Sequence, residues 1–217
     1  MSKTFQLIIF DLDGTLVNSQ YDIADATNYA LAQLNRPLIT YAEIPAMVGS
    51  GIRKLLEIAL GKFTAEELKE ARQHFDHHYA LNYTNKTKCY PEVEETLVHF
   101  KNIKKAVYSN KVHPYTVEIV TKLGLKPQFD LVMGARFDQY KPKPSPEGIH
   151  LILDTLKVKA KDAIMIGDST HDIHAAQAAG LTTCAVTYGY RPIETLMEAN
   201  PDFVIERMGD LKKYVKN

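Results

Sequence analysis

Phe-Asp-Leu-Asp-Gly-Thr-Leu, at residues 10–16, comes directly after the apolar run Leu-Ile-Ile at residues 7–9. Apolar, β-branched residues followed by two acids and a glycine predict a buried strand that ends in a tight turn. Alternate residues of an extended chain share a face, so Asp11 and Asp13 are expected to point at the same small volume. They could be solvated turn residues, but ligands bind at the carboxyl ends of strands in open α/β sheets. Two carboxylates this close repel each other, so a cation or a proton is expected there.

The composition favours a globular protein with a small partner. The 217 residues and 24.5 kDa fit one domain, or one domain with an insert. A chain of this size buries roughly 70% of its unfolded surface. The 26 basic and 26 acidic residues give a formal net charge of zero, so we expect neither a nucleic-acid nor a membrane partner.

The cysteines and the apolar segments favour a cytoplasmic protein. Cys89 and Cys184 stand far apart, which argues against a zinc or redox motif and suits a reducing compartment. Both are expected to be buried. The amino terminus lacks a signal-peptide pattern, and no stretch approaches the ~20 apolar residues of a membrane helix.

Helical patterns fill the region between the first strand and the next one, which is expected at residues 105–108. Helices are predicted at residues 22–34, from residue 41, at 51–61, and at 65–82 behind a capping box that begins at Thr64. An inserted helical segment, residues 18–87, therefore interrupts the sheet after its first strand. Later strands are expected at residues 129–133, 163–166, 183–186 and 203–205.

Two polar pairs follow later strands. Ser109 and Asn110 come after the strand expected at residues 105–108, and on their own they would indicate only a turn. Asp168 and Asp172 lie in Gly-Asp-Ser-Thr-His-Asp, residues 167–172, at the start of a predicted helix. Asp168 or Ser169 could also cap the start of that helix, which would not exclude a role of Asp168 in binding a metal ion.

A proline-rich stretch, Lys-Pro-Lys-Pro-Ser-Pro at residues 141–146, stands between these pairs. Its prolines stiffen the chain, so a lysine could be held at an anionic site without ordering a long loop. Either Lys141 or Lys143 fits this role.

Asp-Leu-Asp-Gly-Thr, at residues 11–15, resembles the first motif of the haloacid dehalogenase superfamily of phosphohydrolases. The stretches at residues 109–110, 143–149 and 167–172 resemble its second, third and fourth motifs in the same order. The resemblance implies a Rossmann-like parallel α/β core, residues 1–17 and 88–217, and a helical-bundle cap, residues 18–87, that closes over the active site.

The resemblance also implies the role of each motif residue. Asp11 attacks phosphorus and becomes an aspartyl phosphate, while Asp13 protonates the leaving oxygen and then deprotonates water. Lys143 neutralises and binds the phosphate, together with Ser109 and Asn110. Magnesium is held by Asp11, Asp13 through its backbone carbonyl, and Asp168, with Asp172 as a direct or indirect support.

Within the cap, Val-Gly-Ser-Gly at residues 48–51 resembles the specificity loop of phosphoglycolate phosphatases. The glycines let the backbone approach a ligand and expose N–H groups at a helix start, although an ordinary turn would need them too. We expect Gly49, Ser50, Gly51 and Arg53 to bind the carboxylate of 2-phosphoglycolate. Alternatively, Arg53 lies on the solvated face of an amphipathic helix.

The sequence therefore predicts a Mg²⁺-dependent hydrolase of small phosphomonoesters. A pyrophosphatase, a sugar-phosphate phosphatase or a phosphosugar mutase would share the four motifs, and a non-catalytic phosphate-binding module would share the fold. His74 and His78 have the spacing of metal ligands on a helix, but no glutamate follows His74, and we expect surface or cap-to-core contacts instead. The oligomeric state is not readable from the sequence.

Overall fold

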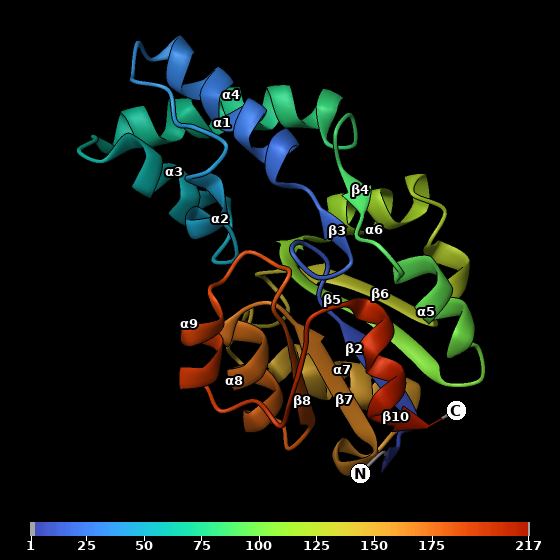
Figure 1. Ribbon diagram of the computed structural model, residues 1–217. Helices are drawn as coiled ribbons and strands as arrows, with labels where there is room; N and C mark the ends of the chain where they lie inside the picture. The colour runs from blue at the N-terminus through green and yellow to red at the C-terminus, as the bar shows by residue number, and fades with distance from the viewer. Residues whose placement is uncertain (1–2, 217) are drawn as a thin grey trace. The chain divides into compact units, whose positions relative to one another are not determined.

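The structure, a computed structural model, describes residues 3–216, which form two compact units (Figure 1). One unit is built from the chain up to Val17 and from Cys89 onward, and the other from Asn18–Lys88. The chain passes from one to the other in β3 (Val17–Asn18) and back in β4 (Lys88–Cys89), and these two strands pair with each other.

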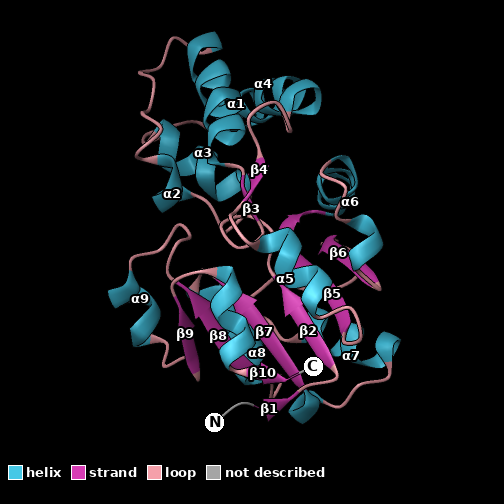
Figure 2. Ribbon diagram, turned by 45° about the vertical axis from the view of Figure 1, so that its right-hand side comes forward, coloured by secondary structure: helices cyan, strands magenta, loops and turns pink. Residues whose placement is uncertain are grey.

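Six parallel strands form the main sheet of the first unit, in the order β6-β5-β2-β7-β8-β9 (Figure 2). The bounds are β2 Leu7–Phe10, β5 Lys104–Val112, β6 Leu131–Ala135, β7 Ala163–Gly167, β8 Thr182–Val186 and β9 Phe203–Ile205, with a separate pair β1 Lys3–Thr4 and β10 Val215–Lys216. The chain builds outward from β2 on one side and then on the other. In such a sheet ligands bind beside the strand where the order reverses.

Helices connect the strands and cover the sheet. They are α5 Val93–His99, α6 His113–Lys122, α7 Glu147–Leu156, α8 Thr170–Ala178 and α9 Ile193–Glu198, with short 3₁₀ turns η1 Lys126–Gln128, η2 Ala160–Asp162 and η3 Met208–Lys213. Right-handed crossovers between parallel strands place α5 and α6 on one face of the sheet and α7 and α8 on the other. The α/β class expected from the sequence is confirmed.

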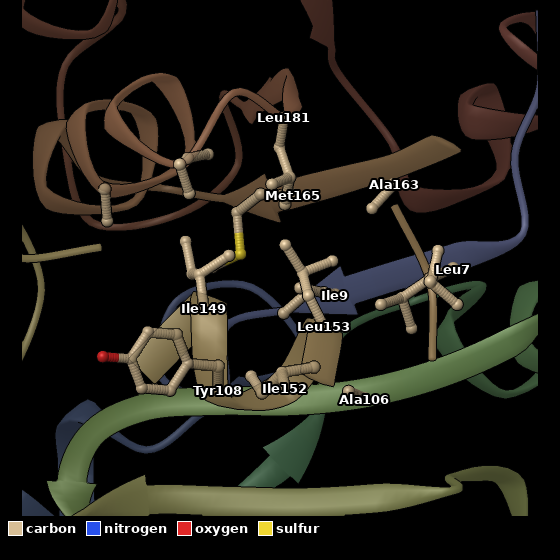
Figure 3. Packing of buried hydrophobic residues seen from close by; sticks show 14 of the residues in the cluster. Leu7, Ile9, Ala106, Tyr108, Ile149, Ile152, Leu153, Ala163, Met165 and Leu181 are labelled. Carbon is tan, nitrogen blue, oxygen red and sulfur yellow. The ribbon is translucent and has the colours of Figure 1, made fainter. Parts of the chain in front are cut away.

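The side chains of α7 seal one face of the central strands (Figure 3). Ile149 and Ile152 of this helix pack with Leu7, Ile9 and Met165, all of them at most 1% exposed. Leu7 and Ile9 are two residues apart and belong to one face, as the pleat of a strand requires. This packing fixes β2, and with it the residues that follow β2.

The second unit consists of four helices: α1 Gln20–Gln33, α2 Ile44–Met47, α3 Ile52–Leu60 and α4 Ala65–Asn82. The predicted capping box is present, since Glu67 N–H donates to Thr64 Oγ1 at 3.1 Å and Thr64 N–H donates to Glu67 Oε2 at 2.8 Å. Phe75 and Tyr79 of α4 stack inside the unit.

Some element boundaries differ from those predicted. The strand expected to end at Tyr108 continues to Val112, with a register shift against β6 after Ser109. The short helix expected from residue 41 begins at Ile44, and the strand expected at residues 129–133 lies at Leu131–Ala135. No helix within residues 3–216 is both long and apolar enough to cross a membrane.

Candidate active site

The predicted acids lie where the central strands end. Asp11 directly follows β2 and Asp168 directly follows β7, the neighbour of β2 in the sheet. Ser109 belongs to β5, the neighbour on the other side. All three residues are buried. The parallel topology therefore brings residues about 160 positions apart in the sequence to one edge of the sheet.

Three buried carboxylates gather at this edge. Oxygen atoms of Asp11, Asp168 and Asp172 lie within 4.8 Å of one another. Burial raises the pKa of Asp11 to about 7, against the lowering effect of the Lys143 charge. Burial, followed by the charges of Asp11 and Asp172, raises the pKa of Asp168 well above its usual range. In both cases burial is the largest cause of the pKa shift, and the neighbouring carboxylates add to it.

Lys143 is the cation of this cluster. Its Nζ lies 2.9 Å from Asp11 Oδ1 and 2.6 Å from Asp172 Oδ1, and it donates to the Tyr108 carbonyl at 2.8 Å. These three contacts match the three donors of an ammonium group. Burial lowers the pKa of Lys143, but the charges of Asp11 and Asp172 outweigh burial, so that the net shift is upward and the ammonium stays charged.

Asn110 fixes the backbone of Lys143. Its side-chain amide donates to the Lys143 carbonyl at 2.9 Å and accepts from the Lys143 N–H at the same distance. The Asn110 side chain thus bonds both the N–H and the carbonyl of the Lys143 backbone, as the backbone of a neighbouring strand would. The sequence predicted Asn110 beside phosphate, and the structure places its amide on the backbone of this lysine.

Glycines make room for two of the carboxylates. A Cβ on Gly189 would lie 2.2 Å from Asp168 Cβ, and one on Gly14 would lie 2.1 Å from Asp168 Oδ2. A Cβ on Gly167 would lie 2.3 Å from Asp172 Cγ. The sequence analysis placed Gly14 and Gly167 in motifs, but it missed Gly189, which comes from a loop far along the chain.

Asp13 has a partner that the sequence analysis also missed. Lys111 Nζ lies 3.1 Å from Asp13 Oδ2, and the two side chains are only 6% and 10% exposed. Lys111 comes from the part of β5 that was not expected to be strand, beyond Ser109, whose Oγ accepts from the Lys111 N–H at 3.2 Å. The only sequence signal would have been its place two residues after Ser109.

Asp172 is held from two sides. Its Oδ1 contacts Lys143, and its Oδ2 accepts from the backbone N–H of Ser169 at 3.1 Å and from Ser169 Oγ at 2.6 Å. Asp168 has a different environment, because its Oδ2 accepts from the Tyr190 N–H at 2.7 Å.

The donor set fits a hard divalent cation. Clustered carboxylate oxygens, without sulfur or imidazole, are the ligands that Mg²⁺ prefers. Of the described residues, this is the one group of three or more potential metal ligands found, and His74 and His78 are not part of it. His74 lies 3.6 Å from Glu70, and the rings of both histidines lie near Tyr29.

Other candidate residues lie elsewhere. The Lys141 side chain is 80% exposed and lies 3.4 Å from Glu147. Cys184 is buried as expected, whereas Cys89, in the two-residue strand β4, is only half-buried, which corrects that prediction.

The predicted cap residues belong to the second unit. Gly49 and Gly51 have φ angles of 116° and 87°, which only glycine adopts readily, and Gly51 caps α3. The Arg53 side chain is 79% exposed and its Nε lies 3.0 Å from Glu57 Oε1 on the same helix. Ser50, which lies between the two glycines, is exposed as well.

Comparisons with known proteins match nearly the whole chain. A family model described as haloacid dehalogenase-like hydrolase matches residues 8–186. The phosphoglycolate phosphatase of Photorhabdus laumondii is 35% identical over 215 residues, which cover 96% of this chain and 92% of the relative. The phosphoglycolate phosphatase of Yersinia pestis is 33% identical over the same shares.

Solved structures agree. The crystal structure of a protein from Haemophilus somnus, described as a predicted phosphoglycolate phosphatase, has a TM-score of 0.90 with 30% identity and covers 97% of this chain and 98% of its own. The resemblance inferred from the four motifs is thus confirmed, and the chain belongs to the haloacid dehalogenase-like hydrolase family.

Proposed function

We propose that this protein is a Mg²⁺-dependent phosphatase that hydrolyses a small phosphomonoester through an aspartyl phosphate on Asp11, with 2-phosphoglycolate as the first candidate substrate. Membership of the hydrolase family and relatives named phosphoglycolate phosphatase support this assignment. The observation that carries it is the buried group of Asp11, Asp168 and Asp172 around Lys143.

The first chemical problem is charge. A carboxylate that approaches a phosphate dianion to ~4 Å meets a repulsion of roughly 8 kcal/mol at an effective dielectric constant of 20. Such a barrier alone would slow the reaction about a million-fold. The Lys143 ammonium, 2.9 Å from Asp11, offsets part of this repulsion and binds the incoming phosphate.

Magnesium would offset most of the remainder. Asp11, Asp168 and the backbone carbonyl of Asp13 would hold it, and the bound ion supplies charge stabilisation on the transferring phosphoryl group. Asp172 supports this set indirectly, because Lys143 and Ser169 already occupy its two oxygens. Asp168, whose carboxylate reaches the same volume from β7, is a direct ligand in this proposal.

The remaining residues handle the leaving group and the phosphate oxygens. Asp11 attacks phosphorus, and Asp13 protonates the leaving oxygen and then accepts a proton from the water that cleaves the intermediate. The Ser109 hydroxyl donates to a phosphate oxygen. Because its side-chain amide holds the backbone of Lys143, Asn110 positions that lysine. The backbone N–H of Asn110 would donate to a phosphate oxygen.

A substrate panel tests the proposal. Purified protein is assayed with Mg²⁺ on 2-phosphoglycolate, pyrophosphate, hexose phosphates and p-nitrophenyl phosphate at equal concentration. We expect the highest kcat/KM for 2-phosphoglycolate, loss of activity in EDTA and its return with Mg²⁺. A clear preference for pyrophosphate or a hexose phosphate would contradict the substrate, and full activity of verified metal-free protein would contradict the metal.

A further inference from the structure

Lys111 is a buried cation that the mechanism above does not use. Its side chain is 6% exposed, and its Nζ lies 3.1 Å from Asp13 Oδ2. A lysine rarely gives up water to this extent without a specific anionic partner. Lys143 is already committed to Asp11, Asp172 and the Tyr108 carbonyl. Lys111 therefore adds a second positive charge on the side of the site where Asp13 lies.

The position of Asp13 determines which part of the substrate lies near Lys111. To protonate the leaving oxygen, the Asp13 carboxyl group must come within about 3 Å of it. In an ester of a 2-hydroxy acid, one CH₂ group separates this oxygen from the carboxylate, a path of two bonds of ~1.5 Å each. The carboxylate of the leaving group thus falls in the volume beside Asp13, which is also where the Lys111 ammonium lies.

We propose that Lys111 binds the anionic group of the leaving alcohol and thereby selects phosphomonoesters of small hydroxy acids. This inference rests on the proposed function and names a specificity residue in the core unit. The three donors of an ammonium group let it contact more than one acceptor, and Asp13 is one such acceptor. Once Asp13 has given its proton to the leaving oxygen, its carboxylate and that of the leaving group would repel each other if no cation lay there.

The sequence analysis expected Arg53 to bind this carboxylate, but the surroundings of Arg53 are less favourable for binding than those of Lys111. The Arg53 side chain is 79% exposed and already paired with Glu57, so water competes for it and screens its charge. A charge-assisted hydrogen bond is stronger where water is excluded, which is the situation of Lys111.

The test compares two substrates that differ only at the distal group. 2-Phosphoglycolate carries a carboxylate, whereas 2-hydroxyethyl phosphate carries a neutral hydroxymethyl group on a leaving alcohol of similar size. The quantity measured is the ratio of kcat/KM for the two substrates in the wild type, Lys111→Met, Lys111→Arg and the exposed control Lys101→Met. We expect the wild type to prefer 2-phosphoglycolate and the ratio to fall about 10- to 100-fold in Lys111→Met, mainly through KM.

The controls separate recognition of charge from a general loss of structure. Lys111→Arg keeps the positive charge and should retain most of the preference, and Lys101→Met should leave the ratio unchanged. If Lys111→Met does not fold, Lys111→Gln takes its place in the same comparison. An unchanged ratio in the folded variant would overturn the inference, including the case in which both substrates lose activity equally.

The wild-type assay distinguishes this inference from the proposed function. Hydrolysis of both esters with no preference for 2-phosphoglycolate would overturn the role of Lys111 and leave the phosphatase assignment intact. Hydrolysis of no phosphomonoester in the presence of Mg²⁺ would overturn both.

Discussion

Lys143 is the residue on which the charge balance of the candidate site depends. It is 4% exposed and contacts the carboxylates of both Asp11 and Asp172. Removal of one partner from a buried ion pair leaves an uncompensated charge, which is costlier than the pair is worth. Lys141, two residues earlier, is exposed and offers a matched control.

Lys143→Ala should lower kcat/KM by at least ~10²-fold and the free energy of unfolding of the metal-free protein by about 3–5 kcal/mol. Lys141→Ala should change the free energy of unfolding by less than about 0.5 kcal/mol and leave kcat/KM within a few-fold. Urea titrations and steady-state kinetics on both variants measure these effects. Equal effects of the two substitutions would remove Lys143 from its special role.

Gly189 acts at the same scale through the space it leaves. Its Cβ would collide with Asp168 Cβ at 2.2 Å and with the Gly14 carbonyl at 2.5 Å, neither of which is a flexible end. Gly189→Ala should therefore displace Asp168 and raise the Mg²⁺ concentration needed for half-maximal activity by about 10- to 100-fold. Gly124→Ala, where a Cβ meets nothing within 4 Å but φ is +73°, should cost stability without changing the Mg²⁺ requirement.

At this scale the motif acids could be predicted from the sequence because short-range patterns carry them. Asp11 follows an apolar strand, and Asp168 lies between an apolar strand and the start of a helix. Lys111 and Gly189 could not be predicted, since their importance depends on what the fold brings against them: Asp13 in one case and Asp168 in the other. From the sequence, Lys111 would be expected to be exposed because it lies in a polar stretch. Its burial follows from the continuation of β5 through this stretch.

Among the elements, the first turn of α1 is tied to the end of the second unit by Asp22. This carboxylate is 1% exposed and accepts from the N–H groups of Lys86 and Thr87 at 2.9 and 2.8 Å and from Thr87 Oγ1 at 2.7 Å. The bonds join residues about 65 positions apart, next to the segments in which the chain enters and leaves the unit.

Asp22→Ala should lower the free energy of unfolding by about 2–4 kcal/mol, because it leaves buried N–H groups without an acceptor. Asp76→Ala, which removes a half-exposed i,i+4 contact with Arg72, should cost no more than about 0.5 kcal/mol. Denaturant unfolding followed by circular dichroism compares the two. A loss below 1 kcal/mol for Asp22→Ala would contradict the structural role given to these bonds.

The element pattern was predictable where local signals are strong. The capping box at Thr64 and the glycine caps of α3 were readable from the sequence. The far end of β5 was not, because the residues from Ser109 to Val112 have no apolar alternation, and their pairing with β6 shifts register. Whether such a segment forms a strand depends on pairing with a neighbouring strand. That neighbour, β6, is distant in the sequence, so local patterns do not reveal it.

The whole molecule combines two compact units, each with a buried apolar interior. We propose that they are an α/β catalytic core and an inserted helical cap. The strands β3 and β4, where the chain crosses, pair with each other, so the ends of the insertion lie about 5 Å apart. If the insertion is removed, a short linker is enough to join the two parts of the core.

A variant in which a short glycine-serine linker replaces residues 19–87 should fold into the α/β core and unfold cooperatively. The reason is that all six strands of the main sheet and the helices that cover it lie outside the replaced segment. Circular dichroism and denaturant titration, with the intact chain as the reference, measure this. A variant without a cooperative transition would show that the core needs the insertion to fold.

The covalent role of Asp11 is the central claim, and trapping the phosphorylated protein tests it most directly. Protein mixed with ³²P-labelled substrate and Mg²⁺ is quenched in acid during turnover, reduced with borohydride and digested for mass spectrometry. We predict acid-stable label on the protein before reduction and conversion of residue 11 to homoserine after it, with neither in Asp11→Asn. Turnover without label on the protein, or label on another residue, would contradict the account.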